Sequence, residues 1–229
     1  SPDTADIFTE RAASAGSAII FDDRMYECSM GKTHYPEGTR DYLLNDIERG
    51  VALSGITELG GDYQARNIPV VAAAVSVLRS GMRISDDHLM AGIRNVRSNT
   101  GLQGRWQVLG RDPVIICDTG HNSAGLEYVV SQLEATPADR LHMIIGFVSD
   151  KDLSRILPLL PPRAVYYFTK ASVPRALDEN ILRLKAEEFN LTGESFATVG
   201  AALSSARMNA GRNDLIFIGG STFVVAEVL

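Results

Sequence analysis

Between residues 114 and 229 the sequence repeats one pattern: a short apolar run, then a segment whose apolar side chains have helical spacing. Such alternation is typical of βαβ units, in which helices join neighbouring parallel strands. We therefore expect an α/β fold with a mostly parallel, doubly wound sheet and flanking helices. The expected strands are Val114–Cys117, Leu141–Gly146, Ala164–Thr169 and Asp214–Ile218, and the expected helices are Ser123–Glu134, Lys151–Leu160, Asp178–Glu188, Val199–Ala210 and Ser221–Leu229.

The first 98 residues follow a mixed pattern of helices and antiparallel strands. The expected elements are a helix over Thr4–Ala15, a short strand over Ala18–Phe21, and irregular strands over residues 25–59 with turns at Gly31-Lys32 and Pro36-Glu37-Gly38. Two further helices are expected over Asn67–Ser80 and, capped by Ser85, Asp86–Val96. Ser98-Asn99-Thr100-Gly101 is the best linker candidate. This predicts two domains, residues 1–98 and 99–229.

Composition limits the classes of partner and compartment. The chain has 229 residues, 45% of them apolar and 22% charged, as in an ordinary globular protein. Its formal net charge of −6 argues against a broad nucleic-acid interface, and its longest nearly apolar stretch, Ile68–Leu78, is too short to span a membrane. Cys28 and Cys117 belong to no paired motif, and the four histidines lack metal-ligand spacing. We therefore expect a cytoplasmic location and no metal site in this chain.

The two ends of the chain and one tripeptide near its start bear on completeness. The chain begins at Ser1 without an initiator methionine or a signal-peptide pattern, and it ends at Leu229 without a polar tail. We therefore expect a piece of a longer protein. Gly31-Lys32-Thr33 has the ending of a phosphate-binding loop, but Tyr26 stands where that loop needs a glycine, so a hairpin turn is expected instead.

Ligands of parallel sheets bind beyond the carboxyl ends of the strands, and the first such end carries a polar segment, Asp118–Ser123. A carboxylate such as Asp118 can accept hydrogen bonds from ribose hydroxyls, and the start of the following helix favours an anion. The alternative is a plain strand-to-helix turn capped by Asn122 or Ser123. A third interpretation is a hydrolase that pairs Asp118 and His121 with Ser221, although residues 219–223 lack the nucleophile-elbow pattern.

Two further strand ends and two segments before the sheet carry candidate site residues. Lys151 would oppose the dipole of a helix beginning there unless an anion is near, whether Asp150, Asp152 or a ligand carboxylate. The glycines and hydroxyls at 219–222 favour an anion. Asn67 is either a ligand contact or an ordinary helix cap. Arg105 is either a phosphate contact reaching across an interdomain cleft or a surface arginine.

Five motifs occur in a fixed order: Gly61-x-Tyr63-Gln64-x-x-Asn67, Gly104-Arg105-Trp106-Gln107, Asp118-x-x-His121-Asn122, Gly146-x-x-x-Asp150-Lys151-Asp152 and Gly219-Gly220-Ser221-x-Phe223. Together they resemble folylpolyglutamate synthase/dihydrofolate synthase, of the Mur ligase superfamily. The resemblance covers residues 60–229, and residues 1–59 fit it more loosely. Where that family usually has D-G-A-H-N-P, this chain has Ser123 in place of the proline, which keeps the spacing of Asp118 and His121.

The resemblance implies a Rossmann-like C-terminal domain, residues 99–229, preceded by a partial α+β remnant of a central ATP-binding domain, residues 1–98. It implies a ligase in which ATP phosphorylates a carboxylate of dihydropteroate or a folate, and the amine of L-glutamate then attacks the acyl phosphate. The implied contacts are Gln64 and Asn67 to the adenine, Arg105 to the ATP phosphates, Asp118 to the ribose, His121 in the same pocket, and Lys151 and Ser221 to a carboxylate of L-glutamate.

The resemblance also implies what this chain would not contain. In that family the phosphate loop and the metal ligands belong to an N-terminal half, so ATP and Mg²⁺ are implied cofactors and the fragment alone is expected to be inactive. No residue here is expected to act as a general base. The alternatives are a free-standing α/β module that binds a nucleotide or an amino acid, and a Mur-type ligase with another substrate. The sequence does not predict an oligomeric state.

Overall fold

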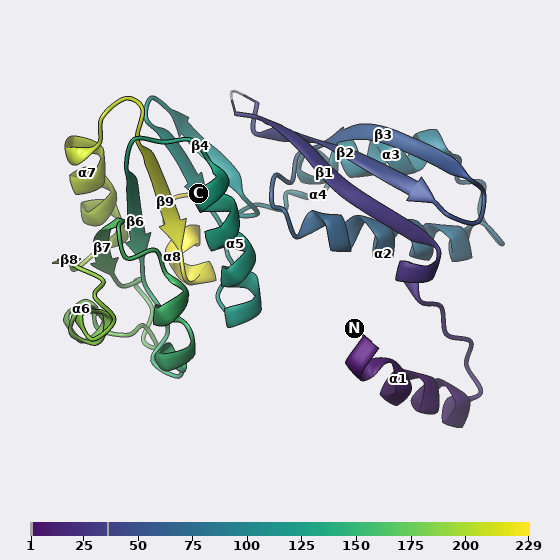
Figure 1. The fold of residues 1–229 in the computed structure, drawn as a ribbon, viewed down its shortest axis with the longest axis horizontal. Helices are drawn as coiled ribbons and strands as arrows, with labels where there is room; N and C mark the ends of the chain where they lie inside the picture. The colour runs from purple at the N-terminus through teal and green to yellow at the C-terminus, as the bar shows by residue number, and fades with distance from the viewer. Residues whose placement is uncertain (1, 36) are drawn as a thin grey trace.

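A computed structural model describes residues 2–35 and 37–229 and contains two separate sheets, each with its own helices (Figure 1). The large sheet has the strand order β4-β5-β9-β6-β7-β8. Its strands are β4 (Gln107–Arg111), β5 (Val114–Cys117), β6 (Leu141–Ile145), β7 (Val165–Thr169), β8 (Gly193–Phe196) and β9 (Leu215–Gly219). All pairs are parallel except β4 with β5 at the edge. The predicted mostly parallel α/β sheet is confirmed.

Helices cover both faces of the large sheet (Figure 1). On one face lie α5 (Ser123–Ala135), the 3₁₀ turns η2 (Leu153–Arg155) and η3 (Leu157–Leu159), and α6 (Glu179–Glu187), around buried Leu126, Phe168 and Leu182. On the other lie α7 (Val199–Asn209) and α8 (Thr222–Ala226), around buried Ile144 and Val224. Because both of their faces are buried, the inner strands β5, β6, β7 and β9 are almost continuously apolar, which is why the sequence pattern located them.

The small sheet is an antiparallel meander of β1 (Tyr26–His34), β2 (Thr39–Asp46) and β3 (Val51–Thr57). Its buried residues, among them Tyr42 and Leu44, pack against Ile68 of α2 (Gln64–Leu78) and Leu89 of α3 (Asp86–Arg94). The short helix α4 (Val96–Thr100) leads towards the large sheet. Before the meander come α1 (Pro2–Ala15) and η1 (Asp22–Arg24), and α1 stands apart from both sheets (Figure 1).

Two predictions near the start of the chain are wrong. Ala18–Phe21 is not a strand, because it pairs with neither described sheet. Gly31-Lys32 is not a hairpin turn: it lies inside β1, where the register with β2 shifts between Met30 and Thr33. The chain reverses instead before β2, where the Gly38 amide donates to the His34 carbonyl at 2.8 Å. Pro36 of the predicted turn lies outside the described residues.

Three later predictions also need correction. The segment Lys151–Leu160 forms the two 3₁₀ turns η2 and η3 rather than an α-helix, because Pro158 has no amide hydrogen for an α-helical bond. The helix expected from Asn67 begins earlier, at Gln64. The expected linker at residues 98–101 is partly helical, since α4 extends to Thr100 and ends at Gly101, whose φ is +71°.

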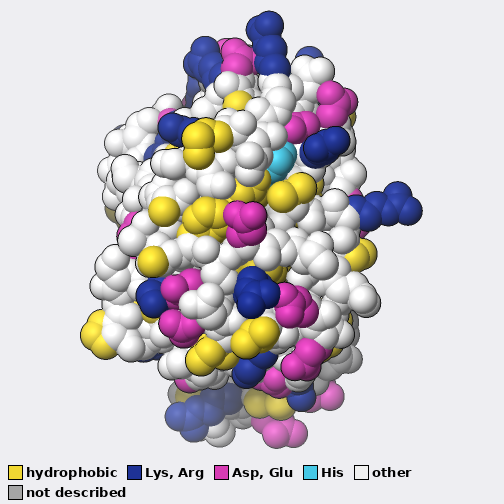
Figure 2. Space-filling model, turned by 90° about the vertical axis from the view of Figure 1, so that its left-hand side faces the viewer, with side chains coloured by type: hydrophobic (Ala, Val, Ile, Leu, Met, Phe, Trp, Pro, Cys, Tyr) yellow, Lys and Arg dark blue, Asp and Glu magenta, His cyan; other side chains and the backbone are white. Residues whose placement is uncertain are grey.

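The side of the molecule where α6, α7 and the edge strand β8 lie has mixed charge. Figure 2 shows basic and acidic side chains interspersed there, with apolar side chains between them. Three of the exposed apolar residues belong to these helices: Ile181, Leu184 and Met208. In the part of the chain that the structure describes, no helix is both long enough and apolar enough to cross a membrane.

A buried polar cluster lies near the amino ends of the parallel strands. The His142 imidazole lies 3.1 Å from an Asp214 carboxylate oxygen and 3.0 Å from the Tyr167 hydroxyl. His142 is 1% exposed and Asp214 is 7% exposed. Burial alone would raise the pKa of the Asp214 carboxyl group. Hydrogen bonds from the Gly211 amide and from His142 lower this pKa by more than burial raises it, so the net pKa lies below the ordinary value.

We expect Asp214→Asn to lower the free energy of unfolding at pH 7 by roughly 1–3 kcal/mol, because it weakens hydrogen bonds to a buried charge. A lowered pKa in the folded state adds stability above the unfolded pKa of about 3.9, and this stability is lost as the pH falls through the folded value. Urea unfolding between pH 7 and pH 3 should therefore show a flatter decline for the variant. Asp112→Asn, which removes an exposed aspartate, is the control. Parallel pH profiles for the wild type and Asp214→Asn would contradict this account.

Candidate functional site

The three polar segments singled out in the sequence meet at the carboxyl edge of the large sheet. Asp118 directly follows β5, Gly220-Ser221 follows β9, and Gly146–Lys151 follows β6. In the sheet these three strands are neighbours in the order β5-β9-β6, and both pairs are parallel. Their carboxyl ends therefore lie side by side, which is the position where parallel α/β sheets bind ligands.

Asp118 is the centre of the first part of this site. Its side chain is fully buried. One carboxylate oxygen, Oδ2, accepts hydrogen bonds from the Tyr63 hydroxyl and the Trp106 amide, each at 2.7 Å, and Oδ1 accepts one from the Gly120 amide at 2.7 Å. Because each carboxylate oxygen has two lone pairs, Oδ1 has capacity for one more donor.

The environment of Asp118 also changes its acidity. Burial raises the pKa of the carboxyl group, the hydrogen bonds from Tyr63, Gly120 and Trp106 lower it, and the net pKa lies above the ordinary value. The pKa of the Tyr63 hydroxyl is raised by burial and by the neighbouring Asp118. Tyr63 therefore donates as a neutral phenol, and Asp118 is a buried acceptor that depends on its three donors.

Arg105 is held at the cavity by the loop that contains it. The Gly104 carbonyl accepts from the Thr119 amide at 2.9 Å, and the Gly104 amide donates to the Gln107 side chain at 2.9 Å. Gly104 has a φ of +72°, and a Cβ there would lie 2.8 Å from Thr119, so this position requires glycine. The exposed Arg105 guanidinium donates to the Thr119 hydroxyl at 2.7 Å. The motif Gly104–Gln107 thus fixes Arg105 beside Asp118.

These residues line a cavity of about 190 Å³, formed by Tyr63, Arg105, Asp118, Thr119, Gly120, His121, Asn122 and Gly125. His121 lies at one side of it, with its Nδ1 3.0 Å from the Thr119 carbonyl. Since a carbonyl only accepts, Nδ1 carries the hydrogen, and Nε2 remains for another partner. Asn122 caps α5 by accepting from the Gly125 amide at 2.8 Å. The cap and a ligand cavity coexist at this turn.

A second cavity, of about 240 Å³, adjoins the first, because His121 lines both. Its other lining residues are Val148, Lys151, Arg175, Gly220, Ser221, Thr222 and Phe223. Ser221 is buried, and its hydroxyl accepts from the Phe223 amide at 3.2 Å as the N-cap of α8. Lys151 does not begin an α-helix, so the dipole argument for a nearby anion no longer applies. What remains is its place in the cavity, where none of the described carboxylates forms an ion pair with it.

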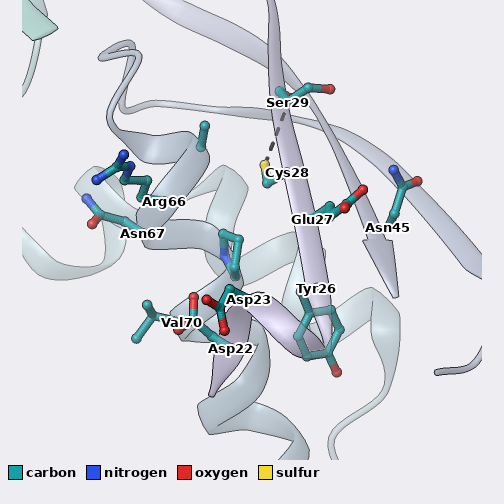
Figure 3. Close-up of a pocket in the computed structure, with 12 residues that line it drawn as sticks. Asp22, Asp23, Tyr26, Glu27, Cys28, Ser29, Asn45, Arg66, Asn67 and Val70 are labelled. Carbon is teal, nitrogen blue, oxygen red and sulfur yellow. Dashed lines mark hydrogen bonds between the residues drawn. The ribbon is translucent and has the colours of Figure 1, made fainter. Parts of the chain in front are cut away.

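Gln64 and Asn67 lie elsewhere. Gln64 is buried, and its side-chain oxygen accepts from the Asn67 amide group at 3.0 Å. Asn67 lines a larger cavity of about 790 Å³ between η1, β1 and α2. Figure 3 shows Arg66 and Asn67 together near the start of α2, with Asp22 and Asp23 on another wall. Asn67 is not an N-cap, since α2 begins at Gln64. The structure thus places Arg105, Asp118 and His121 at one cavity. Gln64 and Asn67 do not line that cavity and instead pair with each other at the start of α2.

The three side chains of the hydrolase interpretation do not form a relay. Asp118 accepts from Tyr63, Trp106 and Gly120, the His121 Nδ1 faces the Thr119 carbonyl, and Ser221 accepts from Phe223. None of these hydrogen bonds joins two of the three. The arrangement therefore lacks the nucleophile–base–acid geometry that such catalysis needs.

Comparison with known proteins agrees with the arrangement of the site. The family profile of the Mur ligase glutamate ligase domain matches residues 104–222, which include the loop of Arg105 and both cavities' strand ends. The chain belongs to the Mur ligase family. The segment before the match contributes to the same site, since Tyr63 reaches Asp118 from outside it.

Two relatives are similar to most of this Mur ligase chain. It is 32% identical over 168 residues to a Haloferax volcanii protein named "Probable bifunctional folylpolyglutamate synthase/dihydropteroate synthase", with 73% of this chain and 19% of that one covered. It is 31% identical over 165 residues to the Escherichia coli dihydrofolate synthase/folylpolyglutamate synthase, with 70% of this chain and 37% of that one covered. The chain thus spans well under half the length of these relatives.

Solved structures share the fold. Mycobacterium tuberculosis folylpolyglutamate synthase complexed with ADP superposes with a TM-score of 0.80 at 21% identity, covering 99% of this chain and 52% of that one. A bifunctional folylpolyglutamate synthase/dihydrofolate synthase with Mn, AMPPNP and L-glutamate bound superposes with a TM-score of 0.71 at 23% identity, covering 96% and 49%. Both sheets of this Mur ligase chain thus have counterparts in about half of a longer chain.

The sequence did not point to three contributors to the site: Tyr63, Trp106 and Arg175. Tyr63 stood inside a recognised motif, but only the folded chain places its hydroxyl on Asp118. Trp106 contributes its backbone amide and adopts a φ of +48°, which is rare for a bulky residue. Arg175 comes from the loop after β7, which carried no motif. The one sequence signal that could have indicated Arg175 is its position, since it is a polar residue in a loop that follows a parallel strand.

Proposed function

We propose that the chain is the C-terminal part of an ATP-dependent ligase that joins L-glutamate to dihydropteroate or a folate through an acyl phosphate. The observation that carries this proposal is the pair of adjoining cavities with His121 in common. One contains the buried carboxylate of Asp118 and the guanidinium of Arg105, and the other contains Lys151 and the hydroxyl of Ser221. A reaction between two bound substrates needs such neighbouring sites.

The relatives support the same chemistry. Proteins similar to this chain carry the names folylpolyglutamate synthase and dihydrofolate synthase, and one solved relative holds AMPPNP, Mn and L-glutamate together. In the proposed reaction, ATP transfers its γ-phosphoryl group to a carboxylate oxygen, giving ADP and an acyl phosphate. The amine of L-glutamate then attacks the carbonyl carbon, the amide bond forms, and phosphate leaves while the amine loses a proton to water.

The proposed contacts follow the two cavities. Oδ1 of Asp118 accepts from a ribose hydroxyl, Arg105 donates to the ATP phosphates through its planar fork, and His121 lies between the nucleotide and the amino acid. Lys151 and Ser221 bind a carboxylate of L-glutamate. Contact of Gln64 and Asn67 with the adenine requires the nucleotide to extend to the start of α2, where Asn67 is exposed. Positioning and charge stabilisation then replace a general base.

We propose that residues outside the described ones hold the metal that ATP needs. Among residues 2–35 and 37–229, no group of three His, Cys, Asp or Glu side chains is placed to hold a metal ion. We therefore assign Mg²⁺ to residues outside the described ones and derive no step through it. We also propose a reducing cytoplasm as the location, since Cys28 and Cys117 are both free thiols.

The proposed domain division follows the two sheets. Residues 1–98 would be the end of a central ATP-binding domain, since they form the small sheet with α2 and α3. Residues 99–229 would be the glutamate ligase domain, since they contain the whole large sheet and the family match at 104–222. Among the described residues, four long-range hydrogen bonds that involve side chains join the two parts, including the Tyr63–Asp118 bond and the 2.8 Å bond from the Gln132 amide group to the Gly60 carbonyl. The cavity around Asp118 would thus lie between the domains.

The complete polypeptide that contains residues 1–229 is expected to release ADP in the presence of ATP, Mg²⁺, dihydropteroate or a folate, and L-glutamate, and to form the glutamylated product seen by mass spectrometry. The isolated 229 residues are expected to form none, because the metal site and a phosphate loop are absent from the described part. Reactions lacking L-glutamate are the control. Product from the isolated chain would contradict the fragment's inactivity. ADP release with another amino acid in place of L-glutamate would favour a different Mur-type substrate.

A further inference from the structure

Arg175 has a fixed backbone position at the second cavity. It lies in the loop between β7 and α6, and this loop is fastened to the loop after β6, which carries Lys151. The Ser149 amide donates to the Arg175 carbonyl at 2.9 Å, and the Leu177 amide donates to the Phe147 carbonyl at 2.9 Å. Val148 and Ala176 also form an isolated β-bridge. The two loops therefore present Arg175 and Lys151 to one cavity as a unit.

Two nitrogens of the Arg175 side chain, Nη1 and Nε, are available for hydrogen bonds to a ligand. Only one of its nitrogens, Nη2, contacts the Asp150 carboxylate, at 3.1 and 3.2 Å. The side chains of Arg175 and Asp150 are 56% and 68% exposed, so this ion pair is weak and can rearrange. The guanidinium carbon lies 5.9 Å from the centre of the Phe223 ring of α8, another residue that lines the cavity. Asp150 and Phe223 thus position the guanidinium at the cavity while leaving Nη1 and Nε available.

The charges of this cavity fit a dicarboxylate. Its lining contains two cations, Lys151 and Arg175, and no acidic residue. Lys151 forms no ion pair with any described carboxylate, and the only ion pair of Arg175 is the exposed one with Asp150. Two carboxylates would give each of the two cations its own ligand partner. An amino acid with both an α-carboxylate and a side-chain carboxylate would engage both.

We propose that Arg175 binds one carboxylate of the incoming amino acid while Lys151 binds the other, so that this pair of cations selects an acidic amino acid as the acceptor of the acyl group. The inference rests on the proposed function and adds to it a specificity residue, Arg175, and a positioning residue, Asp150. The planar fork of arginine suits a bidentate carboxylate contact, and the ammonium of lysine acts as a point charge.

The test compares three amino acids in the complete polypeptide: L-glutamate, L-glutamine, which lacks the side-chain carboxylate, and L-glutamic acid 1-amide, which lacks the α-carboxylate. Arg175→Gln is expected to lower kcat/KM for L-glutamate by about 10- to 100-fold, the scale of one charge-assisted hydrogen bond, and to leave the KM for ATP unchanged. It should abolish the preference for L-glutamate over only one of the two amides. Lys151→Met should abolish the preference over the other. Asp150→Asn should raise the KM for L-glutamate less than Arg175→Gln does.

Arg212→Gln is the matched control, because Arg212 is another exposed arginine paired with an aspartate, and it lies near the amino ends of the strands. It should behave as the wild type. An unchanged KM for L-glutamate in Arg175→Gln, or loss of preference over the same amide in both variants, would overturn the inference while leaving the ligase function intact. A wild-type polypeptide that does not use L-glutamate would overturn the proposed function as well.

Discussion

Replacing Asp118 with alanine is expected to lower the free energy of unfolding by roughly 3 kcal/mol or more and to raise the KM for ATP at least tenfold. The first effect arises because the Tyr63 hydroxyl and the Trp106 and Gly120 amides would lose their common acceptor inside the protein, and each unpaired buried donor costs about 1–3 kcal/mol. The second follows from losing the proposed ribose acceptor. Urea unfolding and ATP titration of the complete polypeptide measure the two effects separately.

A milder variant keeps the test informative if Asp118→Ala does not fold. Tyr63→Phe removes one donor and leaves the carboxylate with two, so it should cost about 1 kcal/mol and keep the chain folded. Its KM for ATP should rise less than that of Asp118→Ala, and its KM for L-glutamate should stay as in the wild type. Asp139→Ala is the control for both, because Asp139 is an exposed aspartate whose carboxylate accepts from the exposed Asn213 amide group at 3.3 Å. An Asp118→Ala protein with unchanged ATP affinity would remove this residue from the nucleotide site.

The architecture of the large sheet follows from local sequence wherever a strand is buried on both faces. Runs such as Val114–Cys117 are apolar because helices cover both sides, and Asn122 marked the start of the next helix. The same reasoning missed β8, because Gly193–Phe196 is an edge strand whose residues are not fully buried. It also missed β4, whose residues are only partly buried or exposed. Edge strands lack the continuous apolar signal.

The helix, strand and turn that were wrongly predicted depend on neighbouring chain segments, which a short stretch of sequence does not show. Pro158 interrupts a run with helical spacing and turns it into 3₁₀ turns. Ala18–Phe21 has the apolar, β-branched composition of a strand but finds no partner strand. Gly31-Lys32 reads as a turn, yet the register shift within β1 accommodates it. In each case neighbouring chain segments decide between structures that the local residues allow.

The candidate site was predictable only where one segment supplies several of its groups. Asp118, His121 and the cap Asn122 belong to one strand end, and they line one cavity. Tyr63 and Arg175 reach the site from segments far away in the sequence, so neither spacing nor composition connects them to it. The position of Gln64 and Asn67 away from Asp118 is likewise a property of the fold, because α2 packs on the small sheet.

Replacing Lys151 with alanine is expected to raise the KM for L-glutamate about 100-fold in the complete polypeptide and to leave the KM for ATP within about twofold. The reason is that Lys151 lines the cavity of Ser221 and Arg175, whereas Asp118 and Arg105 line the neighbouring one. The change removes a charge without unpairing a described carboxylate, so the free energy of unfolding should change by less than about 0.5 kcal/mol. Initial rates at varied L-glutamate and varied ATP separate the two constants.

The decisive comparison is between Lys151→Ala and Asp118→Ala, because the two residues line adjoining cavities that share only His121. If the cavities bind different substrates, the first variant impairs use of L-glutamate and the second impairs use of ATP. Lys185→Ala, at an exposed position on α6, controls for loss of a lysine and should match the wild type. Equal effects of Lys151→Ala on both KM values would mean that Lys151 acts on the nucleotide or on the folding of the whole edge. The two cavities would then form one site rather than neighbouring sites for two reactants.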